Sequence, residues 1–182
     1  MVTATINRAL SCERSHWKRW EVVKRKGMQS MRITKYRTEL NENLHNVLVK
    51  ENGYNYPLES VTSANAIAAM LNTIFRLNKQ AEEHLYMVAL NTKCRILGVF
   101  EVSHGTVNCS ICNPRDIFIK ALLCGATGII LAHNHPSQDT TPSKEDMETY
   151  RRVKESGRMI GIELMDNIIL GNGYFSFHEN RI

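Results

Sequence analysis

The sequence predicts a mixed α/β (α+β) domain in which helices flank a mixed sheet. After about residue 60, short apolar runs alternate with segments whose apolar residues recur at helical spacing. At least two pairs of apolar runs are separated by turns short enough for hairpins, so antiparallel pairs accompany the strands that helices connect. A chain of 182 residues is one ordinary domain plus an appendage, long enough to bury a substantial core.

Three helices are expected, each with a recognisable start or stop. Thr62-Ser63 caps a helix that ends near Asn78, Asn113-Pro114 begins one that Gly125 ends, and a third follows Ser143 and ends at Gly157. The side chains expected to face the core are Ala64, Ile67, Ala68, Leu71, Ile74 and Phe75, then Ile117, Phe118, Ala121 and Leu122, then Met147, Tyr150 and Val153.

The strands are expected at the apolar runs between these helices. Asn91-Thr92-Lys93 turns one strand back on its partner, and Gly171-Asn172-Gly173 forms a second hairpin turn. The predicted strands are 85–90, 94–102, 128–132, 160–165, 167–170 and 174–177.

The residues before this domain differ from it in charge. Residues 1–37 contain ten basic residues and two glutamates, a net charge of +8, whereas the whole chain carries +5 and the remainder therefore −3. We expect residues 1–37 to be a flexible basic extension. The alternative is a nucleic-acid-binding arm, in which the basic residues neutralise phosphates and Trp17 and Trp20 stack on bases. Residues 38–60 are polar, contain Gly53, Pro57 and several asparagines, and are predicted to be a linker, with a short strand or turn near residues 44–49.

Other features of the sequence favour a reduced, cytoplasmic protein. It has no run of 18 apolar residues and no apolar segment of the signal-peptide kind at its start, so we expect neither a membrane span nor secretion. Five cysteines, an odd number, predict free thiols. Cys109 and Cys112 have C-x-x-C spacing, but without a second pair we expect neither a metal nor a redox role for them.

The strongest chemical signal is His133-Asn134-His135-Pro136 at the end of a buried strand. Side chains two residues apart on an extended chain share a face, so His133 and His135 point the same way and can bind one divalent ion. Ser143 then caps the next helix, which places Asp146 in its first turn, facing the histidines. Ser143 and Asp146 alone would indicate only a capping box. Together, His133, His135 and Asp146 make three protein ligands, the arrangement of a catalytic zinc site with an open fourth position.

These residues, read as His-x-His-x7-Ser-x-x-Asp, resemble the JAMM (MPN+) metalloprotease motif at all four positions. The wider sequence, over about residues 61–182, resembles the RadC family of JAB-domain proteins (UPF0758 type). The resemblance rests on Glu83-His84-Leu85, Leu90-Asn91-Thr92-Lys93, Gly105-Thr106, Asn113-Pro114-Arg115-Asp116, His133-Asn134-His135-Pro136-Ser137, Pro142-Ser143 with Asp146, and Ile168-Ile169-Leu170-Gly171.

The resemblance implies a three-layer JAMM/MPN fold, similar to that of cytidine deaminases, and one zinc ion per chain. It implies Glu83 as the general base, with Glu82 and Glu101 as competitors, and Ser143 as the donor to the oxyanion. Asn134 is expected to point away from the metal and order the loop. The chain departs from the family at Gln138, where Gly is common, and at Asn167, where the family has His. Longer RadC-type proteins carry a small helical domain before the JAB domain, and this chain resembles a short form without it.

Three functions follow. The first is a zinc-dependent peptidase or isopeptidase that acts on a peptide or protein substrate. The second is a DNA-associated protein, linked to repair or mobile elements, that binds nucleic acid through residues 1–37. The third is a metal-binding scaffold without turnover.

Overall fold

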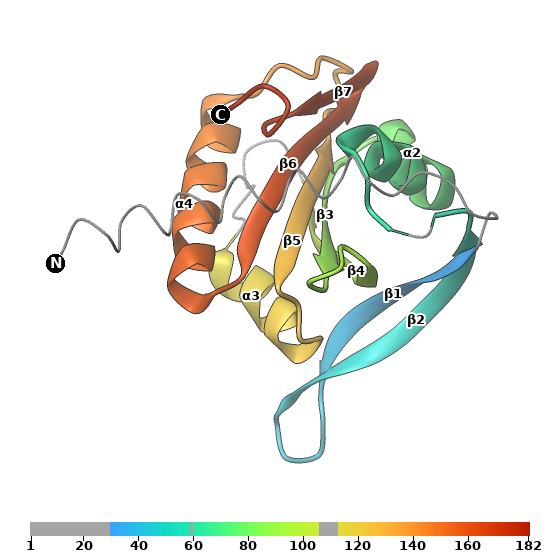
Figure 1. Ribbon diagram of the computed structural model, residues 1–182, viewed down its shortest axis with the longest axis vertical. Helices are drawn as coiled ribbons and strands as arrows, with labels where there is room; N and C mark the ends of the chain where they lie inside the picture. The colour runs from blue at the N-terminus through green and yellow to red at the C-terminus, as the bar shows by residue number, and fades with distance from the viewer. Residues whose placement is uncertain (1–29, 59, 106–112) are drawn as a thin grey trace, which may run out of the picture.

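The computed structural model describes residues 30–58, 60–105 and 113–182, and within them seven strands form one mixed sheet (Figure 1). β1 runs parallel to β4 and β5 runs parallel to β6, while the other neighbouring pairs are antiparallel. The mixed sheet expected from the sequence is confirmed. The order across the sheet is β2 (Asn46–Tyr56), β1 (Met31–Leu40), β4 (Ile96–Gly105), β3 (Glu83–Leu90), β5 (Gly128–Asn134), β6 (Glu163–Gly171) and β7 (Gly173–Ser176).

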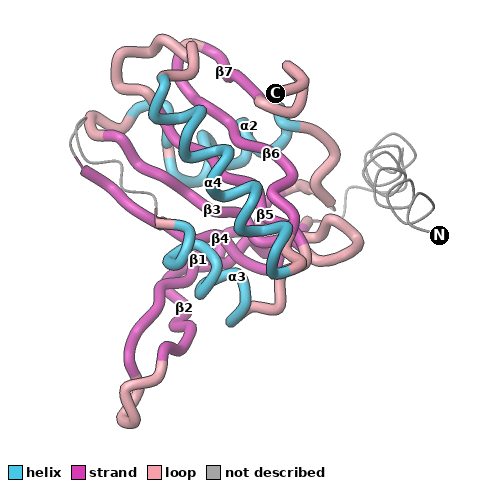
Figure 2. The backbone as a smooth tube through the Cα atoms, turned by 90° about the vertical axis from the view of Figure 1, so that its left-hand side faces the viewer, coloured by secondary structure: helices cyan, strands magenta, loops and turns pink. Residues whose placement is uncertain are grey.

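Helices cover both faces of the sheet and complete the three layers (Figures 1 and 2). α2 (Ala64–Phe75) and the short 3-10 helix η1 (Leu77–Lys79) pack on one face, here the α2 face; α3 (Pro114–Leu123) and α4 (Lys144–Ile160) pack on the other, here the α4 face. Burying a large apolar side chain contributes about 1.5–3 kcal/mol, so the two cores hold the layers together. β3 shows the alternation between them: Tyr86, Val88 and Leu90 face α2, and Leu85, Met87 and Ala89 face α4.

The predicted helix starts are confirmed. Ser63, Asn113 and Ser143 are the N-cap residues of α2, α3 and α4, and each side chain accepts a hydrogen bond from a backbone N–H in the first turn. Such a cap stabilises a helix by about 1 kcal/mol because it satisfies a donor that the helix itself cannot. In α4 this cap also fixes Asp146, a candidate metal ligand.

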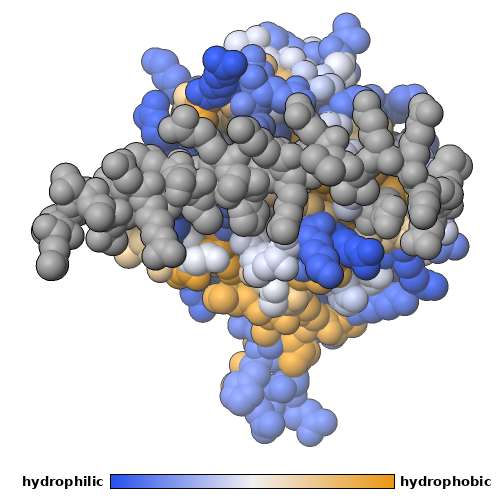
Figure 3. All heavy atoms as spheres, in the orientation of Figure 1, coloured by the Kyte–Doolittle hydropathy of each residue, from blue (hydrophilic) through white to orange (hydrophobic). Residues whose placement is uncertain are grey.

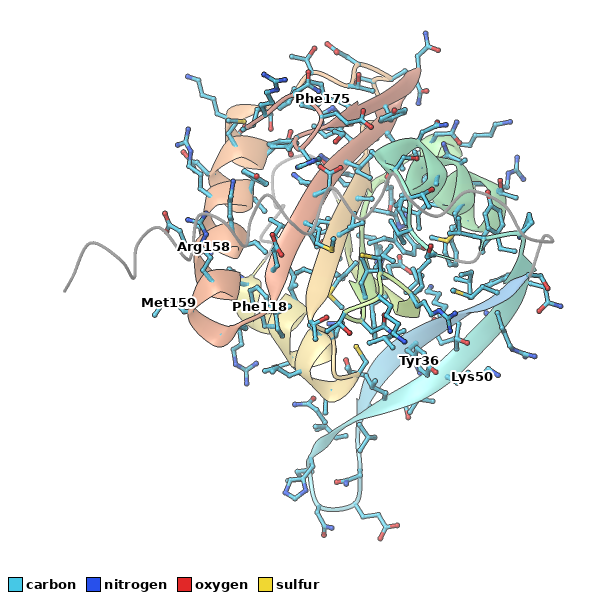
Figure 4. The ribbon with its side chains drawn as sticks, in the orientation of Figure 1. Tyr36, Lys50, Phe118, Arg158, Met159 and Phe175 are labelled. Carbon is cyan, nitrogen blue, oxygen red and sulfur yellow. The ribbon has the colours of Figure 1, made fainter. Side chains whose placement is uncertain are left out.

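Residues 31–56 correct the prediction for the start of the chain. They form the β1–β2 hairpin, which extends away from the rest of the sheet (Figure 1), where an extension and a linker were expected. The hairpin joins β4 through only two residue pairs, Lys35 with Val99 and Tyr36 with Phe100. Tyr36 (Figure 4) stacks on Phe100 with ring centroids 5.9 Å apart. Ile33 is the one buried residue of the two strands, so they lack the apolar alternation that normally predicts a strand.

Three local predictions for residues 114–171 were also wrong. Leu122 was expected in the core, but its side chain is 59 % exposed. Figure 3 shows an apolar area on this side of the molecule, between the tip of the β1–β2 hairpin and the rest of the domain. α4 does not end at Gly157: a Cβ there would lie 2.3 Å from the Ile162 carbonyl oxygen, so glycine is needed for close packing rather than for a helix stop. The helix ends at Gly161, where φ is 75° and the backbone is left-handed. One continuous strand, β6, replaces the two strands predicted at 160–165 and 167–170.

The last turn of α4 is exposed on its outer side. Met159 points away from the sheet and is 88 % exposed, whereas Phe118 of the neighbouring helix α3 is buried (Figure 4).

Among the described residues, no helix has both the length and the apolar character needed to cross a membrane. Cys109 and Cys112 lie outside the described residues.

Candidate metal site

The structure brings His133, His135 and Asp146 together at one end of the sheet. The Nε2 atoms of the two histidines are 3.1 Å apart, and each faces the Asp146 carboxylate: His133 Nε2 is 3.0 Å from Oδ1, and His135 Nε2 is 3.4 Å from Oδ2. Among the described residues this is the one group of three such side chains whose ligand atoms lie close enough to hold a metal ion. His133 is buried, and the other two are partly buried.

Two local structures position these ligands. His133 lies near the end of β5, and the His135 backbone N–H donates to the Leu170 carbonyl of β6 at 2.8 Å, which extends the strand direction past Asn134. Asp146 is held by a capping box: its N–H donates to Ser143 Oγ at 3.1 Å, and the Ser143 N–H donates to its Oδ2 at 2.8 Å. Both positions agree with the sequence prediction.

The geometry fits a tetrahedral metal ion. Ligand atoms at about 2.0–2.2 Å from zinc, separated by tetrahedral angles, lie roughly 3.3–3.6 Å from one another. The three separations between ligand atoms, 3.0, 3.1 and 3.4 Å, are close to the sides of that triangle. His135 is also oriented for binding, because its Nδ1–H donates to the Asp139 carbonyl at 2.7 Å and leaves the lone pair on Nε2. Two imidazoles and a carboxylate are a donor set that suits zinc.

The ligands shift each other's pKa values toward the charged forms. Burial alone would raise the pKa of Asp146, but hydrogen bonds from His133 and then His135 outweigh it and hold that pKa well below its usual range. The hydrogen bond to Asp146 raises the pKa of His135 against the opposing effect of burial, and the negative charge of Glu83 adds to the increase. Asp146 is therefore a carboxylate at neutral pH, the form that binds a metal.

Glu83 lies on the same face of the sheet as the histidines. Leu85 pairs directly with His133 in the antiparallel β3–β5 ladder, so these two side chains share the α4 face. Glu83 is two residues before Leu85 on the same strand and therefore points to that face as well. Glu82 precedes the strand and is exposed.

Glu101, the other competitor, lies on the α2 face. Its Oε2 accepts from Lys35 Nζ at 2.7 Å, its Oε1 is 2.9 Å from His84 Nδ1, and the Tyr86 hydroxyl donates to Oε2 at 3.4 Å. Burial opposes ionisation of Glu101, but the hydrogen bonds from Lys35 and His84 lower its pKa below the usual value. Burial, together with the charge of Glu101, raises the pKa of Tyr86 to about 12. Glu101 is thus committed to a network on the face opposite His133.

The loop after His135 explains one departure from the family pattern. Gln138 has φ of 65°, a left-handed conformation that glycine adopts without strain, which accounts for the glycine common at this position. Gln138 Nε2 donates to the Asn78 carbonyl at 3.1 Å, a contact that glycine would lack. Its carbonyl accepts from the Asn172 N–H at 3.0 Å, so the loop stays attached to the turn between β6 and β7.

Asn134 has a larger role than the sequence indicated. Its side chain is fully buried on the face opposite His133, as the alternation of the strand predicts, but it binds the start of β3 rather than only its own loop. Its partners are about 50 residues earlier in the chain, so no local pattern could have revealed them.

A mixed sheet between helices, with this triad at the end of its central strands, is the architecture of JAB-domain proteins. The family model described as the RadC-like JAB domain matches residues 61–182, and the chain belongs to this family. It is 44 % identical over 133 residues to a UPF0758 protein of Clostridium tetani, covering 72 % of this chain and 56 % of that protein. It is 46 % identical over 120 residues to a UPF0758 protein of Clostridium botulinum (65 % and 52 %), and 41 % identical over 127 residues to one of Symbiobacterium thermophilum (69 % and 54 %). The chain spans about half the length of these curated relatives.

Proposed function

We propose that this chain is a zinc-dependent hydrolase of the JAMM type that cleaves an amide or isopeptide bond in a peptide or protein. The observation that carries the proposal is the triangle of ligand atoms from His133, His135 and Asp146, with Glu83 on the same face of the sheet. A bound zinc ion supplies a Lewis acid that brings the pKa of water down to about 7.

The chain's own residues supply the proton transfers. The Glu83 carboxylate takes a proton from the attacking water and then delivers it to the leaving amine, as a carboxylate beside a metal can. The structural support for this role is the position of Glu83 close to His135. The hydrogen bond with Asp146 is the largest cause of the raised pKa of the His135 imidazole, and the negative charge of Glu83 adds to it. Glu101 is excluded from the same role by its ion pair on the other face.

Ser143 stabilises the oxyanion of the tetrahedral intermediate. Its hydroxyl donates to Asp146 Oδ2 at 2.7 Å, and its Oγ also accepts from the Asp146 N–H. When the hydroxyl hydrogen rotates toward substrate, Ser143 Oγ still accepts from the Asp146 N–H. Ser143 can therefore cap α4 and, at the same time, donate to the negatively charged oxygen of the intermediate.

The test compares zinc-loaded wild type with Glu83→Gln and Glu101→Gln on a panel of peptides and isopeptide-linked proteins. We expect Glu83→Gln to lower turnover by about 10²–10⁴-fold, the usual contribution of a general base. Glu101→Gln should retain turnover, because its amide oxygen can still accept from His84. Equal turnover by wild type and Glu83→Gln would contradict the assignment of the base. A zinc-loaded wild type that cleaves nothing in the panel would favour the scaffold instead.

Nucleic-acid binding by residues 1–37 is the alternative proposal. The structure describes three basic residues of that segment. Lys35 is paired with Glu51 and Glu101, Arg37 is paired with Glu39 and Glu51, and Arg32 is exposed. The ion pairs make Lys35 and Arg37 poorer phosphate ligands, so the alternative depends mainly on Arg32 and on residues 1–29, which lie outside the described residues. Salt-sensitive DNA binding that disappears when residues 1–29 are deleted would support it.

A further inference from the structure

The side chain between the two histidine ligands makes a complete set of hydrogen bonds to the start of β3. Asn134 is 0 % exposed, and its Oδ1 accepts from the His84 backbone N–H at 2.9 Å. Its Nδ2 donates to the Glu82 carbonyl at 2.9 Å and to the Gln80 carbonyl at 3.3 Å. Both amide hydrogens and the oxygen are therefore used on backbone atoms of one short segment.

These bonds enclose Glu83. Asn134 binds the carbonyl of the residue before Glu83 and the N–H of the residue after it, which fixes the peptide groups on both sides. Glu83 is the first residue of β3, a position where a strand normally frays. Because Asn134 is also the last residue of β5, between His133 and His135, one side chain connects the ligand strand to the backbone of the proposed base.

A second contact holds the same strand end from the α2 face. His84 Nδ1 lies 2.9 Å from Glu101 Oε1, so the His84 side chain is held while its N–H is bound by Asn134. With His84 fixed on one face, alternation directs Glu83 to the other, where the metal ligands are. Residues 82–84 are thus held both by the Glu101 network on the α2 face and by Asn134, and they carry Glu83 on the α4 face, where the metal ligands lie.

We infer that Asn134 is a positioning residue, which holds the Glu83 carboxylate in register with His133 and His135. The inference rests on the proposed function, in which Glu83 acts beside a bound metal. Asn134 touches neither metal nor substrate in this role. It acts through the backbone at residues 82 and 84, so its loss leaves all three metal ligands in place.

The experiment uses cobalt(II) as the metal probe, because its visible absorption reports the surroundings of the ion. The variants are Asn134→Ala, Glu83→Gln and the matched control Asn167→Ala. The control also removes a buried amide, 2 % exposed, but from β6, where Asn167 pairs with Leu131 of β5. Asn134→Asp, which keeps the oxygen that accepts from His84 and removes both donors, replaces Asn134→Ala if that variant does not fold. Hydrogen exchange of the His84 amide is measured in parallel.

We expect Asn134→Ala to bind about one cobalt per chain, as wild type does, because its ligands are intact. Its absorption spectrum should change in the same direction as that of Glu83→Gln, and exchange of the His84 amide should speed up about tenfold. Asn167→Ala should match wild type in both measurements.

The outcomes separate the inference from the function. A wild-type spectrum for Asn134→Ala, with a changed spectrum for Glu83→Gln, overturns the positioning role and leaves the proposed function standing. Wild-type spectra for both variants place Glu83 away from the metal and overturn both proposals. A changed spectrum in Asn167→Ala equal to that in Asn134→Ala would mean that any buried amide has this effect, and it also overturns the inference.

Discussion

Asp166 provides a quantitative test of burial in the protein interior. It is 3 % exposed in β6 and accepts three hydrogen bonds: from the Asn167 N–H and the His178 N–H at Oδ1, and from the Ser176 hydroxyl at Oδ2. Burial raises the pKa of Asp166 from 3.8 to about 6, although these hydrogen bonds oppose the increase. Asp166→Asn keeps an oxygen for the two backbone donors, and Ser176 can accept from the new amide by turning its hydroxyl.

The raised pKa of Asp166 in the folded state means that the stability of the protein falls as pH rises. Below pH 3.8 both folded and unfolded chains are protonated at Asp166, so its full contribution to stability is present. As pH rises toward 6 the unfolded chain ionises first, and the folded state is destabilised progressively until Asp166 ionises there too. A pKa difference of roughly 2 units corresponds to about 3 kcal/mol at 1.36 kcal/mol per unit, most of it lost between pH 4 and 7.

The assay is urea unfolding of wild type and Asp166→Asn at pH 4 and pH 7.5. We expect the stability of Asp166→Asn relative to wild type to increase by about 2 kcal/mol between these pH values, while any pH-independent cost of the substitution cancels. A relative stability that stays constant, or that moves in favour of wild type, would refute the reasoning and mean that the three donors outweigh burial.

Two further predictions concern the loop and helix that hold the ligands. Ser143→Ala should destabilise the protein by about 1 kcal/mol, or roughly 2–4 °C in Tm by calorimetry, because α4 loses its cap, whereas Ser143→Thr should retain most of that stability. An unchanged Tm in Ser143→Ala would mean that the capping box contributes nothing. Gln138→Gly should change the free energy of unfolding by less than about 1 kcal/mol, since relief at φ 65° offsets the lost bond to Asn78, while Gln138→Val should destabilise clearly more. Equal unfolding free energies for the glycine and valine variants would contradict the strained geometry.

The parts of the fold that local chemistry determines could be predicted from the sequence. Ser63, Asn113 and Ser143 are helix caps because their short polar side chains satisfy the first backbone donors, and that signal is visible in a few consecutive residues. The spacing of His133 and His135 at a strand end likewise places both on one face. Asp146 followed from the cap at Ser143.

The remaining features depend on contacts between distant residues. β1 and β2 bury only Ile33 and are held by pairing with each other, so their sequence lacks a strand pattern. Gly157 has the residue type of a helix stop, but what requires glycine there is the approach of Ile162. The resemblance favoured Glu83 over Glu101, but the residues themselves do not show that the two side chains lie on opposite faces. That depends on the register between β3 and its neighbours. The role of Asn134 depends on the same register.

The most direct test of the metal site is the metal content of the purified protein after dialysis, for wild type, His135→Ala and Asp146→Ala. Elemental analysis identifies the metal without assuming zinc. The geometry predicts about one zinc per chain in wild type and loss in both variants, with all three proteins folded by circular dichroism. A folded wild type without metal, or variants that retain zinc as wild type does, would contradict the site on which the proposed function rests.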